Sequence, residues 1–126
     1  VEPKKQRVED MQNGTYEVAL TRWGPDYADP MTYLGMWITD NSNNYGLWSN
    51  ADYDAMIDEC TTGDLCTDAE GRWAKMYEAE KIVMDDAVIF PLYTAANAQM
   101  ISSSVTGLEQ HPVALNRVYK NVVKED

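Results

Sequence analysis

The chain has 126 residues, of which 44% are hydrophobic, and its formal net charge is −11. This is enough apolar material for one core in a single small domain, and the sequence contains no run of about 18 apolar residues that would span a membrane. Ten Asp or Glu residues and no Lys or Arg lie between Arg22 and Arg72. Such a stretch repels phosphate groups, which argues against nucleic acid and anionic membrane surfaces as partners.

The first predicted elements are a helix and a strand. Pro3 suits the first position of a helix that runs to Gln12, and Gly14 suits its end. Residues 16–23 alternate between apolar and polar side chains, which predicts a strand that Gly24-Pro25 ends. This strand has no partner nearby in the sequence, so we expect its neighbours to precede Val1. A start at Val-Glu-Pro without Met also fits a piece excised from a longer protein.

Three helices follow in the prediction. Asp29 and Pro30 fit the N-cap and first position of a short helix, and a polar, Asn-rich loop comes after it. Apolar residues at helical spacing predict the second helix over Asn50–Cys60. A capping box at 67–70 introduces the third helix, over Arg72–Asp86. Its predicted apolar stripe consists of Trp73, Met76, Tyr77, Val83 and Met84.

The remaining residues predict strands. Residues 87–93 are apolar and β-prone, although Pro91 restricts them to an edge or a bend. Residues 97–101 fit a second short strand, residues 102–107 a turn, and residues 118–123 a last strand.

The chain has two cysteines, Cys60 and Cys66, whose spacing differs from that of a CxxC redox pair. Together with a single histidine they are too few ligands for a zinc site. A local disulfide across the Gly-containing turn is the favoured interpretation and would imply an oxidising compartment. Two free thiols are the alternative.

The sequence argues against an enzyme and predicts no cofactor. A Ser–His–Asp hydrolase needs a histidine base, and the only histidine, His111, lies near the end of the chain without a GxSxG motif. A stand-alone acidic secreted hydrolase stays open because carboxylates are plentiful. So does a cation-binding module at Asp40–Gly46. That loop departs from an EF-hand because Tyr45 and Ala51 replace its glycine and final glutamate.

One motif decides between these alternatives. Residues 23–34 read WGPDYADPMTYL, which resembles the W-x-x-D-Y-x-D/E-P-x-x-F/Y-L stretch of the oligopeptide- and dipeptide-binding proteins of ABC importers, family 5 of the extracellular solute-binding proteins. Further family patterns follow in the same order at residues 50–57, at residues 72–86, and in Ile-Phe-Pro-Leu-Tyr at residues 89–93. The resemblance therefore covers nearly the whole chain.

The resemblance implies an α/β fold, a partial C-terminal lobe of the type II periplasmic-binding-protein class, with helices packed on a small mixed sheet. Residues 1–107 would form the second half of the C-terminal ligand-binding lobe. Residues 108–126 would form a C-terminal tail that packs on the absent N-terminal lobe.

The implied function is capture of peptides between two lobes, without catalysis, in the periplasm or at the outer face of the cell membrane. The partners are then the permease subunits of the importer, and contact with the membrane is through a lipid anchor on the missing N-terminus. Relatives of the family that bind nickel, haem or an oligosaccharide supply alternative ligands.

The resemblance also names site residues. In this family the Asp after W-x-x binds the α-ammonium of the peptide, and Asp26 matches it. Trp23 and Tyr27 flank it in the motif and are the other expected ligand-binding residues. Considered without the rest of the motif, Asp26 would be a turn residue and Trp23 a core residue.

Overall fold

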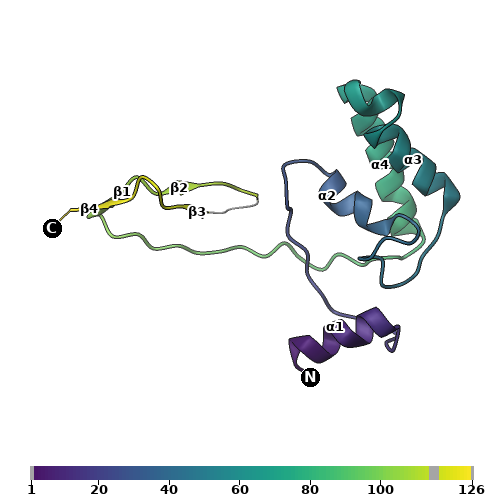
Figure 1. Ribbon diagram of the computed structural model, residues 1–126, viewed down its shortest axis with the longest axis horizontal. Coiled ribbons are helices and arrows are strands. Elements are labelled where there is room, and N and C mark those ends of the chain that lie inside the picture. The colour runs from purple at the N-terminus through teal and green to yellow at the C-terminus, as the bar shows by residue number, and fades with distance from the viewer. Residues whose placement is uncertain (1, 114–116, 126) are drawn as a thin grey trace. The chain divides into compact units, whose positions relative to one another are not determined.

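The computed structural model describes residues 2–113 and 117–125 (Figure 1). Two compact units are present. The helical unit consists of Val1–Trp23 and Asp29–Phe90, and the strand unit consists of Gly24–Ala28 and Pro91–Asp126.

Local capping residues set the helices of the helical unit. The side chain of Asn50 accepts hydrogen bonds from the backbone amides of Asp52 and Tyr53, and that of Asp68 accepts one from Gly71. These are the N-cap bonds that satisfy amides in a first helical turn. The three predicted long helices are confirmed. The helical elements are α1 (Lys4–Asn13), α2 (Met31–Leu34), η1 (Gly35–Trp37), α3 (Ala51–Thr61), η2 (Asp64–Thr67) and α4 (Ala69–Asp85).

Two helices end in the same way. Gly14 follows α1 with φ of 66°, and its amide and that of Thr15 donate to the carbonyl groups of Met11 and Asp10. After α4, Ala87 takes φ of 53°, and the amides of residues 87 and 88 bond back to residues 84 and 83. Both patterns are Schellman motifs, which satisfy the last carbonyl groups of a helix. Glycine supplies the left-handed backbone after α1, as predicted, whereas an alanine supplies it after α4.

The core lies mainly between α3 and α4, which pack side by side with α2 (Figure 1). Its buried residues are Met31, Leu34, Tyr53, Ile57, Cys60, Met76, Ala79 and Val83. The predicted stripe of the last helix was partly wrong, because Trp73, Tyr77 and Met84 are 60%, 70% and 41% exposed. The buried face of α4 instead carries the small residue Ala79. This residue is 0% exposed and allows close approach of a neighbouring helix.

Three predicted strands are wrong as secondary structure. Residues 16–23, 87–93 and 97–101 form no ladder in the described part of the chain. A strand exists only when its amide and carbonyl groups bond to a neighbour. The described residues provide no such neighbour here, so these segments form no β-ladder despite their β-prone composition.

The strand unit contains two antiparallel ladders of two strands each. In one, β1 (Val105–Thr106) pairs with β4 (Val123–Lys124), and in the other β2 (Glu109–Gln110) pairs with β3 (Arg117–Val118). The predicted last strand thus begins in β3 and ends in β4, with a turn between them. Gly107 is required beside this turn, since a Cβ there would lie 1.9 Å from the carbonyl oxygen of Asn121. Helices with a small amount of sheet agree with the expected α/β class, although the described strands form two antiparallel ladders in place of one small mixed sheet.

The expected Cys60–Cys66 disulfide is absent, and both thiols are free. Cys60 is buried on the core face of α3, where its thiol lies 3.8 Å from the carbonyl oxygen of Arg72. Cys66 lies in η2 and is exposed to solvent. The disulfide prediction is therefore corrected: the packing of α3 against α4 fixes Cys60 as a core residue.

Candidate functional site

Trp23, the first residue of the motif, is held at the edge of the helical unit. Its indole Nε1 donates a hydrogen bond to the carbonyl oxygen of Thr32 at 3.1 Å. Thr32 is buried in α2, whereas the Trp23 side chain is exposed. The motif therefore folds back so that its beginning contacts the helix at its end.

Asp29, further along the motif, is bound by an arginine from a distant part of the chain. The Arg72 guanidinium donates to both carboxylate oxygens of Asp29, at 2.7 and 3.1 Å. One of these oxygens also accepts a hydrogen bond from the amide of Met31 at 2.8 Å. Asp29 thus bonds to the first turn as expected, but the predicted helix start is shifted by one residue, because α2 begins at Met31 and Pro30 holds the N-cap position.

The pair is largely withdrawn from solvent, since the side chains of Arg72 and Asp29 are 19% and 30% exposed. The hydrogen bond from Arg72 is the main cause that lowers the pKa of the Asp29 carboxyl, against the opposing effect of burial. A bidentate guanidinium–carboxylate pair fixes orientation as well as distance. Asp29 is therefore ionised and held in one geometry near neutral pH.

The same arginine also caps a helix. Its Nε donates to the carbonyl oxygen of Cys60 at 2.8 Å. That carbonyl group belongs to the last turn of α3, where carbonyl groups have no amide donor within the helix. The sequence prediction missed this role of Arg72. The one available signal was compositional, because Arg72 is the first basic residue after a stretch rich in acids.

Asp26 and Tyr27 belong to the strand unit, whereas Trp23 belongs to the helical unit. The side chains of Asp26 and Tyr27 are exposed. An exposed carboxylate can accept hydrogen bonds from a cationic group, and an exposed tyrosine ring can offer an apolar surface to a ligand. The assignment of these three residues to a ligand site remains a prediction.

The Asn-rich loop has a structural role. The Asn44 side chain is buried, donates to the carbonyl oxygens of Ile38 and Trp48, and accepts from the amide of Trp48. Asn41 likewise donates to the carbonyl oxygen of Gly35. These amides are used within the loop. In the described ranges, no group of three or more His, Cys, Asp or Glu residues could hold a metal ion.

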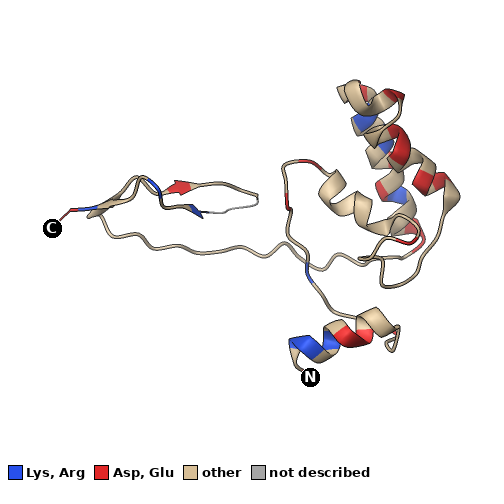
Figure 2. Cartoon of the chain, viewed as in Figure 1, with Lys and Arg blue, Asp and Glu red and all other residues tan. Residues whose placement is uncertain are grey.

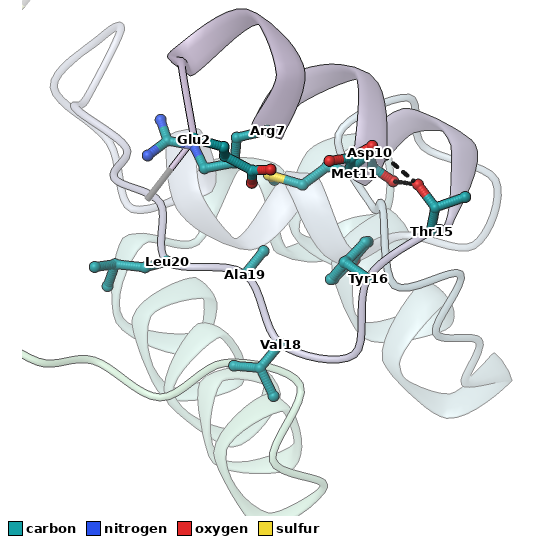
Figure 3. Close-up of a pocket in the computed structure, with 9 residues that line it drawn as sticks. All are labelled: Glu2, Arg7, Asp10, Met11, Thr15, Tyr16, Val18, Ala19 and Leu20. Atoms are coloured by element: carbon teal, nitrogen blue, oxygen red, sulfur yellow. Dashed lines mark hydrogen bonds between the residues drawn. The ribbon is translucent and has the colours of Figure 1, made fainter.

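A groove of about 410 Å³ lies between α1 and the residues that follow it (Figure 3). Figure 3 shows Thr15 bonded to Asp10 at one end and Arg7 and Glu2 at the other. Three of the residues that line it are the apolar Val18, Ala19 and Leu20. The candidate ligand-binding residues do not line this groove, and it brings together no set of catalytic groups.

Charge is distributed unevenly within the helical unit. Figure 2 shows acidic residues along α3, both acidic and basic residues along α4, and basic residues in the first turns of α1. None of the described helices combines the length and the apolar character that a membrane crossing requires.

Comparison with known proteins identifies relatives of the entire chain. Over 113 residues it is 34% identical to a dipeptide-binding protein of Lactococcus lactis subsp. cremoris, a match that covers 90% of this chain and 20% of the relative. It also matches the substrate-binding domain of an oligopeptide ABC transporter from Bacillus anthracis, with a TM-score of 0.84 and 32% identity over 100% of this chain and 24% of that one. The chain is homologous to part of the oligopeptide- and dipeptide-binding proteins.

A further member of this family, Listeria monocytogenes OppA with a bound peptide, gives a TM-score of 0.78 and 33% identity over 98% of this chain and 23% of that one. Some relatives are named periplasmic proteins. No protein-family model matches the chain. The chain spans about a fifth of the length of the curated relatives that it matches. The family predicted from residues 23–34 is thus confirmed, and the homologues are binding proteins rather than enzymes.

Proposed function

We propose that this chain is part of an extracytoplasmic binding protein that captures peptides and delivers them to an ABC importer. The observation that carries the proposal is the match of nearly the whole chain to peptide-binding proteins at 30–34% identity. The same segment matches an OppA that was solved with a bound peptide. The binding protein has no catalytic role of its own and meets the permease subunits of the importer.

In this proposal residues 1–107 contribute the second half of the C-terminal lobe. Residues 108–126 form a tail that packs on an N-terminal lobe outside this chain. A lipid anchor on a preceding segment holds the protein at the membrane. The proposed ligand is enclosed when the two lobes close on a hinge, a movement typical of periplasmic binding proteins.

Asp26 is proposed to anchor the amino terminus of the peptide. A closed binding site excludes water, so the ligand ammonium needs an ionised partner there. Trp23 and Tyr27 would shield this pair with their rings. Extended protein segments would bond to the peptide backbone, which gives affinity without a demand for particular side chains.

The test is Asp26→Asn in the intact binding protein that contains this chain, with calorimetry on a tripeptide and on its N-acetylated form. Loss of one partner from a buried charge pair costs about 3–5 kcal/mol, or roughly two to three decades in Kd. We expect this loss for the free-amine peptide and little change for the acetylated one, which already binds weakly to the wild type.

Asp64→Asn is the matched control, because it removes the same charge from an exposed position in η2. It should leave both affinities unchanged. Equal binding of the free-amine peptide by wild type and Asp26→Asn would reject Asp26 as the anchor. A wild-type protein that binds no peptide at all would reject the proposed function.

A further inference from the structure

The groove beside α1 contains a cationic side chain with a donor that lacks an acceptor (Figure 3). The Nε atom of Arg7 is buried, and it makes no hydrogen bond to any residue that the structure describes. Buried donors in folded proteins are nearly always paired, because a donor left without an acceptor costs free energy. Arg7 is therefore placed to donate to a group from outside the described residues.

The opposite wall of the groove lacks partners along its backbone. Residues 16–22 form no β-ladder, and their main chain makes no hydrogen bond in the described part of the chain. Val18 and Leu20, which line the groove, are 92% and 68% exposed. An extended segment laid along this wall would bond to its backbone groups and cover both apolar side chains.

We propose that the groove receives an extended segment of the same protein, which precedes this chain. This segment pairs with residues 16–22, and one of its carbonyl oxygens accepts the hydrogen bond from the Nε of Arg7. The inference rests on the proposed function, in which the first half of the lobe lies before Val1. The relative from Lactococcus lactis has room for such a segment, because this chain covers 20% of its length.

The charges in the groove favour a main-chain carbonyl over a charged group as the acceptor. Arg7 shares the groove with the carboxylates of Glu2 and Asp10, so the lining carries more negative than positive charge. A further carboxylate would be repelled by these acids. A carbonyl oxygen is neutral and accepts a hydrogen bond from a guanidinium without adding charge. The neighbouring Val18 and Ala19 are apolar and suit the apolar side chains of a strand.

A photo-reactive side chain identifies the occupant in the intact binding protein. Val18 is replaced by p-benzoylphenylalanine, the purified protein is irradiated, and mass spectrometry locates the captured peptide. We expect a peptide that precedes Val1 in the same molecule. Lys5 is the control position, because its side chain is 86% exposed on α1 and does not line the groove, and it should not capture this peptide. Capture of residues 91–101 or of a second copy at position 18, or no capture, would overturn the proposal.

Hydrogen exchange in the same intact protein tests the pairing and the part of Arg7 in it. Pairing along one edge bonds about every second amide. About half of the amides of residues 16–22 should therefore exchange at least about a hundredfold more slowly than in an unstructured peptide. Arg7→Met keeps the length of the side chain and removes its donor, so exchange at the protected amides should rise about tenfold, while α3 stays within about twofold of wild type. Lys5→Met removes a charge from the same helix and should match wild type.

Exchange of residues 16–22 at the rate of an unstructured peptide would reject the paired segment. Equal exchange in wild type and Arg7→Met would reject the role of Arg7. Calorimetry of the wild type with the free-amine tripeptide separates this inference from the proposed function. Capture of the preceding segment by a protein that binds no peptide would support the groove and reject the proposed function, whereas peptide binding with failed capture would reject the groove alone.

Discussion

Tyr53 supplies the most direct test of the packing in the helical unit. Its side chain is 0% exposed, and its ring packs edge-on against that of Trp48, with 5.0 Å between the ring centroids. Its hydroxyl donates a hydrogen bond to the carbonyl oxygen of Leu34 at 2.6 Å. Burial raises the pKa of Tyr53 above its usual range, so the hydroxyl stays protonated and able to donate. Tyr53→Phe removes this bond and keeps the ring.

The expected loss of stability follows from the buried carbonyl group. A neutral hydrogen bond contributes about 1 kcal/mol net, and a buried acceptor left without its donor costs about 1–3 kcal/mol. We therefore expect Tyr53→Phe to lower the free energy of unfolding by about 2 kcal/mol. With a urea m value of about 1–3 kcal/mol per molar, the midpoint should fall by roughly 1 M at constant m.

Urea titrations followed by circular dichroism measure this change. Tyr77→Phe is the matched control, because Tyr77 is 70% exposed on α4 and should stay within about 0.5 kcal/mol of wild type. If both variants unfold at the wild-type midpoint, the hydroxyl of Tyr53 does not stabilise the packing of α2 against α3.

The remaining predictions concern pH and thiol chemistry. Arg72 lowers the pKa of Asp29 in the folded protein. Asp29 therefore stabilises the fold above its unfolded pKa of about 3.9, and this stability is lost as pH falls through the lower folded value. The urea midpoint of wild type should approach that of Arg72→Met below about pH 4, and a constant difference would contradict the ion pair. Burial raises the pKa of the Cys60 thiol, whereas Cys66 is exposed. Iodoacetamide should thus label Cys66 in the native protein and Cys60 only after unfolding, as mass spectrometry would show; equal rates would contradict the burial of Cys60.

The helices could be predicted because their signals are local. Asn50 caps α3, and Gly14 ends α1. The capping box expected at 67–70 was wrong in its residues, because Thr67 lies in η2 and the side chain of Asp68 caps α4 instead. The buried face of α4 could not be read in the same way. The stripe was predicted from large apolar side chains such as Trp73. Which side chains are buried, however, depends on which face of α4 packs against α3. That face carries Ala79, whose small size gives a weak signal in the sequence.

Local sequence patterns could not predict which distant residues pair with one another. Residues 16–23 have the composition of a strand, but a ladder needs a partner that the described residues do not supply. Arg72 and Asp29 lie 43 positions apart, and nothing local to either indicates their bond. The family, in contrast, could be predicted because the motif at 23–34 is contiguous. The role of Asp26 depends on a ligand and so stays a prediction.

The unpaired stretch at residues 89–101 has a consequence for handling the molecule. Phe90 and Tyr93 are each 83% exposed, and no ladder occupies the backbone groups around them. Extended, apolar backbone of this kind is a template for another copy of the same segment, so a preparation of this chain alone is prone to intermolecular β-aggregation. Pro91 has no N–H to donate and interrupts such pairing in the middle of the apolar residues. Charged substitutions at Phe90 or Tyr93 would extend the same protection without touching the core.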